Sequence, residues 1–298
     1  MDIVELYVII DDFCKKFTPK YIKLMKNNGL ISRNRSGMIS MSEIILILIL
    51  FPHSEFKCFK WFYIYKIMHG EYRSYFKAVP SYNRFVEQMS TGLLILSRLL
   101  GYLMYYYRKQ NMGINYIDST RIPVCHNKRT KSHKVFESVA EIGKSTMGWF
   151  LGFKLHMIID TKGNILSVNL TKGNVDDRVP VMKLIKELSG KLFGDKGYIK
   201  KELAQELQEL GITLITPLKK NMKARFIPIN IFDLIMSKKR ILIESVFNIL
   251  KNKLQLCHTR HRSMKNFCVH ILSVLVGYQL SSNKPSINLE VCNLLGFN

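Results

Sequence analysis

Three acidic residues lie far apart in the sequence and could do chemistry together: Asp118, Asp195 and Glu244. Carboxylate oxygens are hard ligands, and three of them brought together would suit Mg²⁺ or Mn²⁺. Two such ions about 3.5–4 Å apart activate an attacking oxygen and stabilise a leaving oxygen, as phosphodiester transfer requires. The three acids therefore predict metal-assisted chemistry on phosphodiesters, provided that the fold brings them together.

Glu244 is the acid for which a structural explanation is least satisfactory. If residues 239–250 form a helix, apolar side chains cover much of its surface and one polar stripe remains: Arg240, Glu244, Asn248 and Lys251. An ion pair between Arg240 and Glu244 is one explanation, but such i, i+4 pairs contribute only about 0.3–0.5 kcal/mol. This small gain does not explain why so basic a segment keeps one acid.

The two aspartates each follow a segment that reads as a strand. Residues 114–120 are a strand candidate that ends near Asp118, and KLFGD is a short strand that ends at Asp195. Sites in α/β sheets tend to lie outside the carboxyl ends of strands, and Gly197 would let the chain turn away sharply. An aspartate after a strand is also an ordinary turn or cap residue, and this alternative stays open for both.

The elements between these acids predict a mixed α/β sheet with flanking helices. Two β-rich runs, 149–160 and 165–173, are separated by the turn signal Thr-Lys-Gly-Asn and predict a hairpin. The segments that follow read as a helix at 176–190, a strand at 191–195, a helix at 199–211, a strand at 212–218 and a helix at 239–250. An antiparallel hairpin joined to alternating strands and helices favours such a sheet.

The first 110 residues predict an all-α N-terminal domain, followed by a sheet domain over 111–280 and a tail over 281–298. The apolar run Ile44–Phe51 is much shorter than the roughly 20 residues needed to span a bilayer. Ser40 and Glu43 precede it with the spacing of a capping box, so we expect a buried helix.

Residues 81–89 contain a candidate recognition helix for DNA ends, with Asn83, Arg84 and Gln88 as base-contacting side chains. Helices of this kind are also common without DNA contact. A packing or dimerisation role for this helix therefore stays open.

The charge balance indicates a polyanionic partner. The 298 residues include 45 Lys and Arg against 22 Asp and Glu, a net charge of +23. Nucleic acid is the leading candidate because cationic side chains release counterions from phosphates, and an anionic membrane is the main rival. Six cysteines without a CxxC pair favour reduced thiols, and no secretory leader is apparent, so we expect a cytoplasmic protein.

Three blocks of the sequence resemble the DDE transposases of bacterial insertion sequences, and the insertion-sequence-982 family is the most similar. The blocks are YIDSTRIPVCHNKR (116–129), GDKGY (194–198) and RILIESVFNILK (240–251). The third block has the Arg, three residues, Glu, six residues, Lys spacing of many such enzymes. These enzymes often have a Tyr three residues before the Arg, where this sequence has Ser237.

The resemblance implies an RNase H-like fold in which Asp118, Asp195 and Glu244 form a catalytic triad that binds Mg²⁺ or Mn²⁺. It implies hydrolysis of double-stranded DNA at the ends of the element, strand transfer into target DNA, and a homodimer or higher multimer that pairs two ends. It places Arg240 and Lys251 near the DNA backbone. The alternatives are a catalytically inactive DNA-binding relic and an RNase H-like nuclease without strand transfer.

Further cationic side chains are candidate DNA contacts: His126, Lys128, Arg129, Lys154, Lys196, Arg260 and Arg262. The loop 125–134 either contacts phosphates or is a solvated charge run. Lys154 and His156 alternate on a strand and face either DNA or the edge of the core. Asp176 and Asp177 either replace a triad member or cap a helix.

Overall fold

The structure, a computed structural model, describes residues 2–29, 37–146, 148–217, 231–257 and 261–288. The chain divides into two units. Unit 1 consists of Met1–Tyr102 and Leu250–Ser282, and unit 2 consists of Leu103–Ile249 and Asn283–Asn298.

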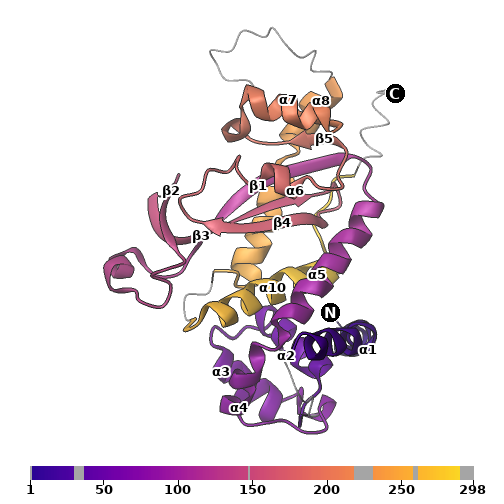
Figure 1. The fold of residues 1–298 in the computed structure, drawn as a ribbon, viewed down its shortest axis with the longest axis vertical. Helices are drawn as coiled ribbons and strands as arrows, with labels where there is room; N and C mark the ends of the chain where they lie inside the picture. The colour runs from indigo at the N-terminus through magenta and orange to yellow at the C-terminus, as the bar shows by residue number, and fades with distance from the viewer. Residues whose placement is uncertain (1, 30–36, 147, 218–230, 258–260, 289–298) are drawn as a thin grey trace. The chain divides into compact units, whose positions relative to one another are not determined.

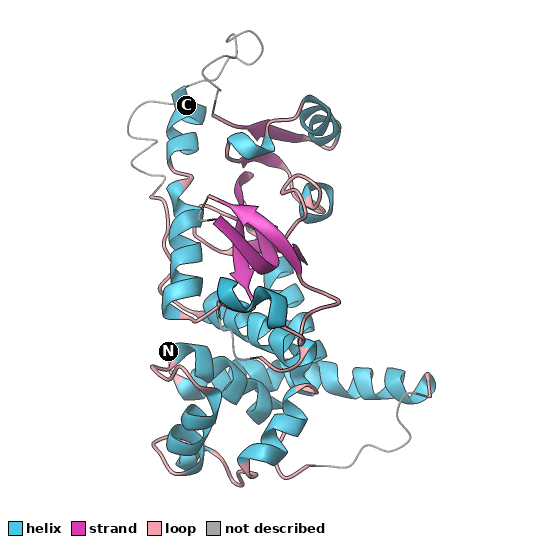
Figure 2. Cartoon of the chain, turned by 90° about the vertical axis from the view of Figure 1, so that its left-hand side faces the viewer, coloured by secondary structure: helices cyan, strands magenta, loops and turns pink. Residues whose placement is uncertain are grey.

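The described part of unit 1 is built from helices (Figure 2). They are α1 (Ile3–Asn27), α2 (Met41–His53), α3 (Phe59–Phe62), the π-helical η1 (Tyr63–Met68), the short η2 (Arg73–Tyr75), α4 (Tyr82–Met89), most of α5 (Gly92–Lys109), most of the π-helical η5 (Ile249–Lys253) and α10 (Met264–Leu280).

Helix α2 forms the apolar centre of unit 1. The predicted capping box is present: Glu43 N donates to Ser40 Oγ at 3.2 Å, and Ser40 N donates to Glu43 Oε2 at 2.6 Å. Every residue from Ile44 to Phe51 is buried, and α1 and α10 both pack against this helix. The expected buried helix is therefore confirmed. No helix in the described ranges is long and apolar enough to cross a bilayer.

The two units differ from the domain boundaries expected from the sequence. Residues 250–282 group with the N-terminal helices because α10 packs along α2. Residues 283–288 belong to unit 2, where Ile287 N donates to Thr161 O at 2.8 Å. The rest of the expected tail, 289–298, lies outside the described residues.

Unit 2 contains a six-stranded mixed sheet. Its strands are β1 (Ile114–Pro123), β2 (Glu141–Ser145), β3 (Gly148–Ile159), β4 (Ile165–Lys172), β5 (Gly190–Phe193) and β6 (Ile212–Ile215). Strand β3 pairs antiparallel with β1, β2 and β4, whereas β5 pairs parallel with β1 and β6 (Figure 1). The predicted mixed α/β sheet and the β3–β4 hairpin are confirmed.

Helices lie on both faces of this sheet. Neighbouring residues of β1 point to opposite faces and therefore contact different helices. The helical elements are η3 (Asn127–Ser132), α6 (Val181–Leu184), η4 (Lys196–Tyr198), α7 (Lys201–Glu209), α8 (Ile231–Lys238) and α9 (Ile241–Asn248). Ile117 belongs to a buried cluster with residues of α6 and α7. Tyr116, on the opposite face, donates to Met236 Sδ of α8 at 3.5 Å, and α9 packs against β1.

Two expectations about these elements were wrong. Strand β1 does not end near Asp118 but continues to Pro123, because antiparallel pairing with β3 extends to Gly152. The helix expected over 176–190 is only the single turn α6, since Pro180 delays its start and Glu187 has a left-handed φ of 63°.

Strand β2 was not predicted, and it packs by close backbone approach. A Cβ added to Gly143 would collide with the carbonyl oxygen of Gly173 and would lie 3.0 Å from the ring of Phe150. A Cβ added to Gly173 would lie 2.7 Å from the carbonyl oxygen of Glu141. Only glycine allows β2 to lie this close to the end of β4.

Gly143→Ala is therefore expected to destabilise unit 2 by roughly 2 kcal/mol or more, because the colliding atom is backbone and cannot rotate away. Thermal denaturation should show a Tm lower by several degrees. Gly101→Ala on α5 is the matched control, since no described atom outside its own helix lies within 4 Å of the added methyl. This control should be neutral or stabilising. Equal Tm changes in the two variants would contradict the packing described for β2.

Candidate active site

Asp118 lies in the middle of β1 with 22% of its side chain exposed. Its Oδ1 accepts a hydrogen bond from Ser119 N at 2.8 Å, and its Oδ2 accepts one from Arg240 Nη1 at 3.2 Å. The carboxylate is therefore held from two sides, by its own strand and by the residue that precedes α9.

Arg240 joins two of the three predicted acids. Its Nη2 donates to Glu244 Oε1 at 2.9 Å while its Nη1 binds Asp118. The i, i+4 ion pair considered from the sequence is thus present, but it is extended to a residue on β1. Glu244 is 52% exposed, whereas the Arg240 side chain is 22% exposed. A single cation therefore bridges a carboxylate on the sheet and a carboxylate on α9.

Asp195 follows β5, the parallel neighbour of β1. The pairing of the two strands ends at Tyr116 and Phe193, and each aspartate lies two residues beyond this pair. The two aspartates consequently lie at equivalent positions of neighbouring strands, just beyond the carboxyl end of β5. The ordinary cap role is also present, because Gly197 N donates to Asp195 Oδ1 at 2.8 Å.

The three acids share one electrostatic environment. The pKa of Asp118 is raised to about 6, chiefly by burial, and the negative charges of Asp195 and Glu244 act in the same direction. The Ser119 N–H and the charge of Arg240 act in the opposite direction. The Asp118 carboxylate is therefore ionised at neutral pH at a cost, and a nearby cation reduces that cost.

The donor set suits a hard divalent cation, since all of its atoms are carboxylate oxygens. In the part of the chain that the structure describes, no three His, Cys, Asp or Glu side chains are already arranged to hold a metal ion. The positive charge between Asp118 and Glu244 is that of Arg240. The Arg240 guanidinium shows that oxygens of Asp118 and Glu244 can share one cation.

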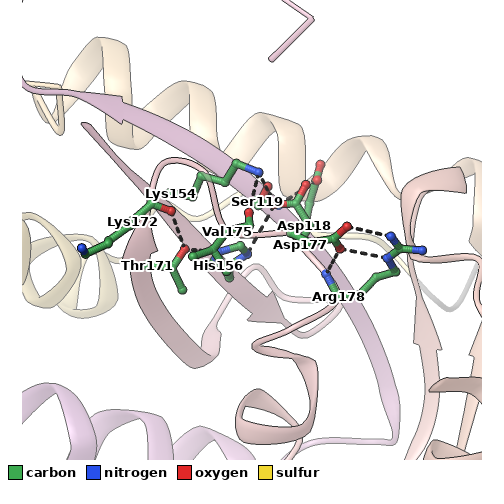
Figure 3. Close-up of polar contacts among 10 residues, drawn as sticks. Asp118, Ser119, Lys154, His156, Thr171, Lys172, Val175, Asp177 and Arg178 are labelled. Carbon is green, nitrogen blue, oxygen red and sulfur yellow. Dashed lines mark hydrogen bonds and ion pairs between the residues drawn. The ribbon is translucent and has the colours of Figure 1, made fainter. Parts of the chain in front are cut away.

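A second polar cluster lies on β3 and the loop after β4 (Figure 3). Lys154 Nζ donates to Val175 O at 2.9 Å and to Asp177 Oδ1 at 3.1 Å. His156 is fully buried, and its Nε2 lies 2.8 Å from Thr171 Oγ1. Burial lowers the pKa of His156 to about 4, so the ring is neutral at neutral pH and faces the core. Lys154 is engaged with Asp177.

Asp176 does not cap a helix as expected. Its Oδ1 and Oδ2 accept hydrogen bonds from Arg178 at 2.8 and 2.6 Å, and the N-cap of α6 is Pro180. Asp176 thus pairs with Arg178 and Asp177 pairs with Lys154, so both acids have partners outside α6.

Among the other candidate DNA contacts, His126, Lys128 and Arg129 are exposed at η3, and Lys196 is exposed directly after Asp195. The remaining candidates were Lys251 and Arg262, which belong to unit 1, and Arg260, which lies outside the described residues.

The candidate recognition helix forms as α4, with Ser81 as its N-cap. Asn83 and Arg84 are exposed, and Arg84 Nη1 pairs with Glu87 Oε2 at 2.9 Å. The proposed role of this helix at DNA ends stays a prediction.

Comparison with protein families places this site in a known context. The family model described as a transposase DDE domain matches residues 108–264, which is more than half of the chain. The chain belongs to the transposase DDE domain family. Asp118, Asp195 and Glu244 all lie within the matched region. The DDE transposase resemblance is thus confirmed, whereas the insertion-sequence-982 subgroup and a bacterial origin stay predictions.

The other comparisons add little. No curated protein matches this DDE transposase chain. Among solved structures, a cryo-EM structure of the piggyBac transposase synaptic complex with hairpin DNA is 11% identical, with 93% of this chain and 73% of that chain covered and a TM-score of 0.48. A likeness this weak carries no conclusion about function.

Sequence reasoning assigned no role to Tyr198, although it closes the GDKGY block. Its side chain is buried next to the residues that precede both aspartates. The position of Tyr198, three residues after the predicted catalytic acid Asp195, was the sequence signal that could have indicated a role for it.

Asp118→Asn is expected to stabilise the metal-free chain at high pH. The folded-state pKa of about 6 lies above the ordinary value of 3.8. Below about pH 4 the Asp118 carboxyl is protonated and its contribution to the free energy of unfolding is fully present. This contribution is lost as the pH rises through about 6. The amide of the variant does not ionise and avoids this loss. The free energy of unfolding of the variant should therefore exceed that of the wild type by on the order of 3 kcal/mol at pH 8, and by about half of that at pH 5. Denaturant titrations in the presence of a chelator measure the difference, and an offset that is constant across this pH range would contradict the assignment.

Proposed function

We propose that this chain is a DNA transposase in which Asp118, Asp195 and Glu244 form the catalytic triad of an RNase H-like domain. The substrate is double-stranded DNA at the ends of an insertion sequence, which is first hydrolysed and then joined to target DNA. The observation that carries the proposal is that Asp118 is in electrostatic contact with both other acids and shares the Arg240 guanidinium with one of them.

Divalent cations are the proposed cofactors, since DDE transposase domains generally use them. Mg²⁺ or Mn²⁺ bound by the three carboxylates would supply activation of the attacking oxygen and stabilisation of the leaving oxygen. Asp118 presents an ionised but poorly solvated carboxylate, which favours the binding of a cation. Glu244 is more exposed and can adjust to the ligand.

Arg240 has two compatible roles. In the chain alone it neutralises Asp118 and Glu244. Its planar guanidinium equally matches the paired oxygens of a DNA phosphate. Contact with the DNA backbone would exchange its carboxylate partners for phosphate oxygens, as the resemblance to DDE transposases implies.

The excess positive charge would hold the DNA. Forty-five Lys and Arg face only 22 acids, and the exposed cations of η3 and Lys196 belong to the same unit as the three acids. A homodimer or higher multimer would pair two DNA ends. The candidate contacts in unit 1, including those on α4, would bind the terminal repeats.

Cleavage of DNA that carries the terminal repeats tests the triad. The inverted repeats flanking the reading frame supply the substrate. Asp118→Asn, Asp195→Asn and Glu244→Gln are each expected to reduce Mg²⁺- or Mn²⁺-dependent cleavage by at least about 100-fold, since even indirect partners of metal ligands cost 10- to 100-fold.

The same assay separates the alternatives. Glu206→Gln, on the exposed surface of α7, is the matched control and should cut like the wild type. A triad variant that cut at the wild-type rate would remove that residue from the proposal. Wild-type cleavage without joined products would indicate a nuclease, and salt-sensitive binding without cleavage would indicate an inactive relic.

The η3 cations should bind DNA phosphates independently of base sequence. Lys128→Ala combined with Arg129→Ala is expected to reduce the slope of log K against log[salt] by about 0.9 for each phosphate that the double variant no longer neutralises. Fluorescence anisotropy with a DNA duplex measures this slope. Lys201→Ala, which changes an exposed lysine on α7 with no proposed role in DNA binding, is the control. An unchanged slope in the double variant would identify η3 as a solvated charge run.

A further inference from the structure

Tyr198 occupies a position that connects both aspartates of the site. It ends the η4 turn, in which Tyr198 N donates to Asp195 O at 3.2 Å. A Cβ added to Gly194 would lie 3.0 Å from Cδ2 of the Tyr198 ring and 3.2 Å from Cγ2 of Ile117. Gly194 and Ile117 directly precede Asp195 and Asp118. The ring therefore packs beside Gly194, in the same buried apolar cluster as the Ile117 side chain.

The Tyr198 hydroxyl has no evident structural purpose in the chain alone. The residue is 2% exposed, and the hydroxyl has no hydrogen-bond partner among the described residues. A buried hydroxyl without a partner destabilises the fold, whereas phenylalanine would fill the same space without that penalty. A ligand that forms a hydrogen bond with this hydroxyl would explain why the residue is tyrosine and not phenylalanine.

Another buried tyrosine shows the usual arrangement. Tyr63 is fully buried in unit 1, and its hydroxyl donates to Pro80 O at 2.8 Å. The Tyr198 hydroxyl thus differs from that of Tyr63, which has a hydrogen-bond partner.

Those surroundings are negatively charged. Burial raises the pKa of Tyr198, and the charges of Asp118, Asp177 and Asp195 raise it further against the opposing charge of Arg240. The phenol therefore keeps its proton at neutral pH and acts there as a neutral donor or acceptor. Its charge neighbours come from β1, from the loop after β4 and from the end of β5.

We propose that the Tyr198 hydroxyl donates a hydrogen bond to an oxygen ligand that enters the carboxylate site. That oxygen belongs either to the water of a hydrated divalent cation or to a phosphate group of DNA. The proton stays on the phenol, so Tyr198 positions the ligand and takes no part in proton transfer. This inference rests on the proposed function, because it requires that the three carboxylates bind a cation and DNA.

Three forms of the full chain test this role: the wild type, Tyr198→Phe, and Tyr63→Phe as a matched loss of one buried hydroxyl. Mn²⁺ binding without DNA is measured by calorimetry, and binding of terminal-repeat DNA in Ca²⁺ is measured by anisotropy. Tyr198→Phe should keep or raise the Tm and weaken one of the two affinities by about 5- to 10-fold. Tyr63→Phe should lower the Tm, because Pro80 O loses its donor, and should leave both affinities unchanged.

The two affinities together identify the oxygen. Weaker Mn²⁺ binding by Tyr198→Phe would support the water of a hydrated cation, and weaker DNA binding with normal Mn²⁺ binding would support a phosphate oxygen. Wild-type values for both would overturn the inference and leave the proposed function intact. A wild-type chain that bound neither Mn²⁺ nor DNA would overturn the proposed function together with this inference.

Discussion

The partly buried carboxylate of Asp118 is the constraint on which the remaining features depend. A charge at this depth in the sheet is unfavourable unless positive charge or hydrogen-bond donors lie nearby, and Ser119 N–H and Arg240 supply both. Helix α9 packs against β1 and buries Leu242, Ile243, Val246 and Phe247, and Arg240 at its start links Asp118 to Glu244. The arrangement stabilises the chain less than an apolar residue would, and it keeps an ionised oxygen ligand ready. Such a loss of stability is common at functional sites, and it is the expected cost of the cation binding proposed for Asp118.

The scaffold around this carboxylate is conventional in its physics. One face of β1 packs Ile117 against α6 and α7, and the other packs Tyr116 against α8. Strand alternation thus gives two apolar layers, with Asp118 on the same face as Tyr116 and α9. Strand β5 pairs parallel with β1 over only a few residues, and this pairing brings Asp195 close to Asp118. Long-range sheet pairing and one helix together bring three distant positions into one electrostatic neighbourhood.

Much of this arrangement was predictable, because strong local signals agreed with the final fold. The capping box at Ser40, the hairpin of β3 and β4 and, apart from the shortened α6, the alternating elements after it formed as the residue patterns indicated. The failures have physical causes. The extent of β1 depends on its pairing with β3, and the position of β2 depends on a backbone contact at Gly143. Neither contact leaves a pattern in the local sequence. Contacts between residues far apart in the sequence, such as that of Arg240 with Asp118, also follow only from the assembled sheet.

The short β5 strand has an evolutionary consequence. The position of Asp195 depends on the pairing of Phe193 with Tyr116, and only three residue pairs join β5 to β1. A shift by one residue would displace the aspartate by about 3.3 Å and turn its side chain toward the opposite layer. If Asp195 binds a metal ion as proposed, a residue gained or lost within β5 would disable the site while every acidic residue survived. An intact acidic signature in a degenerating copy of such a gene is therefore a poor guide to whether that copy can still move.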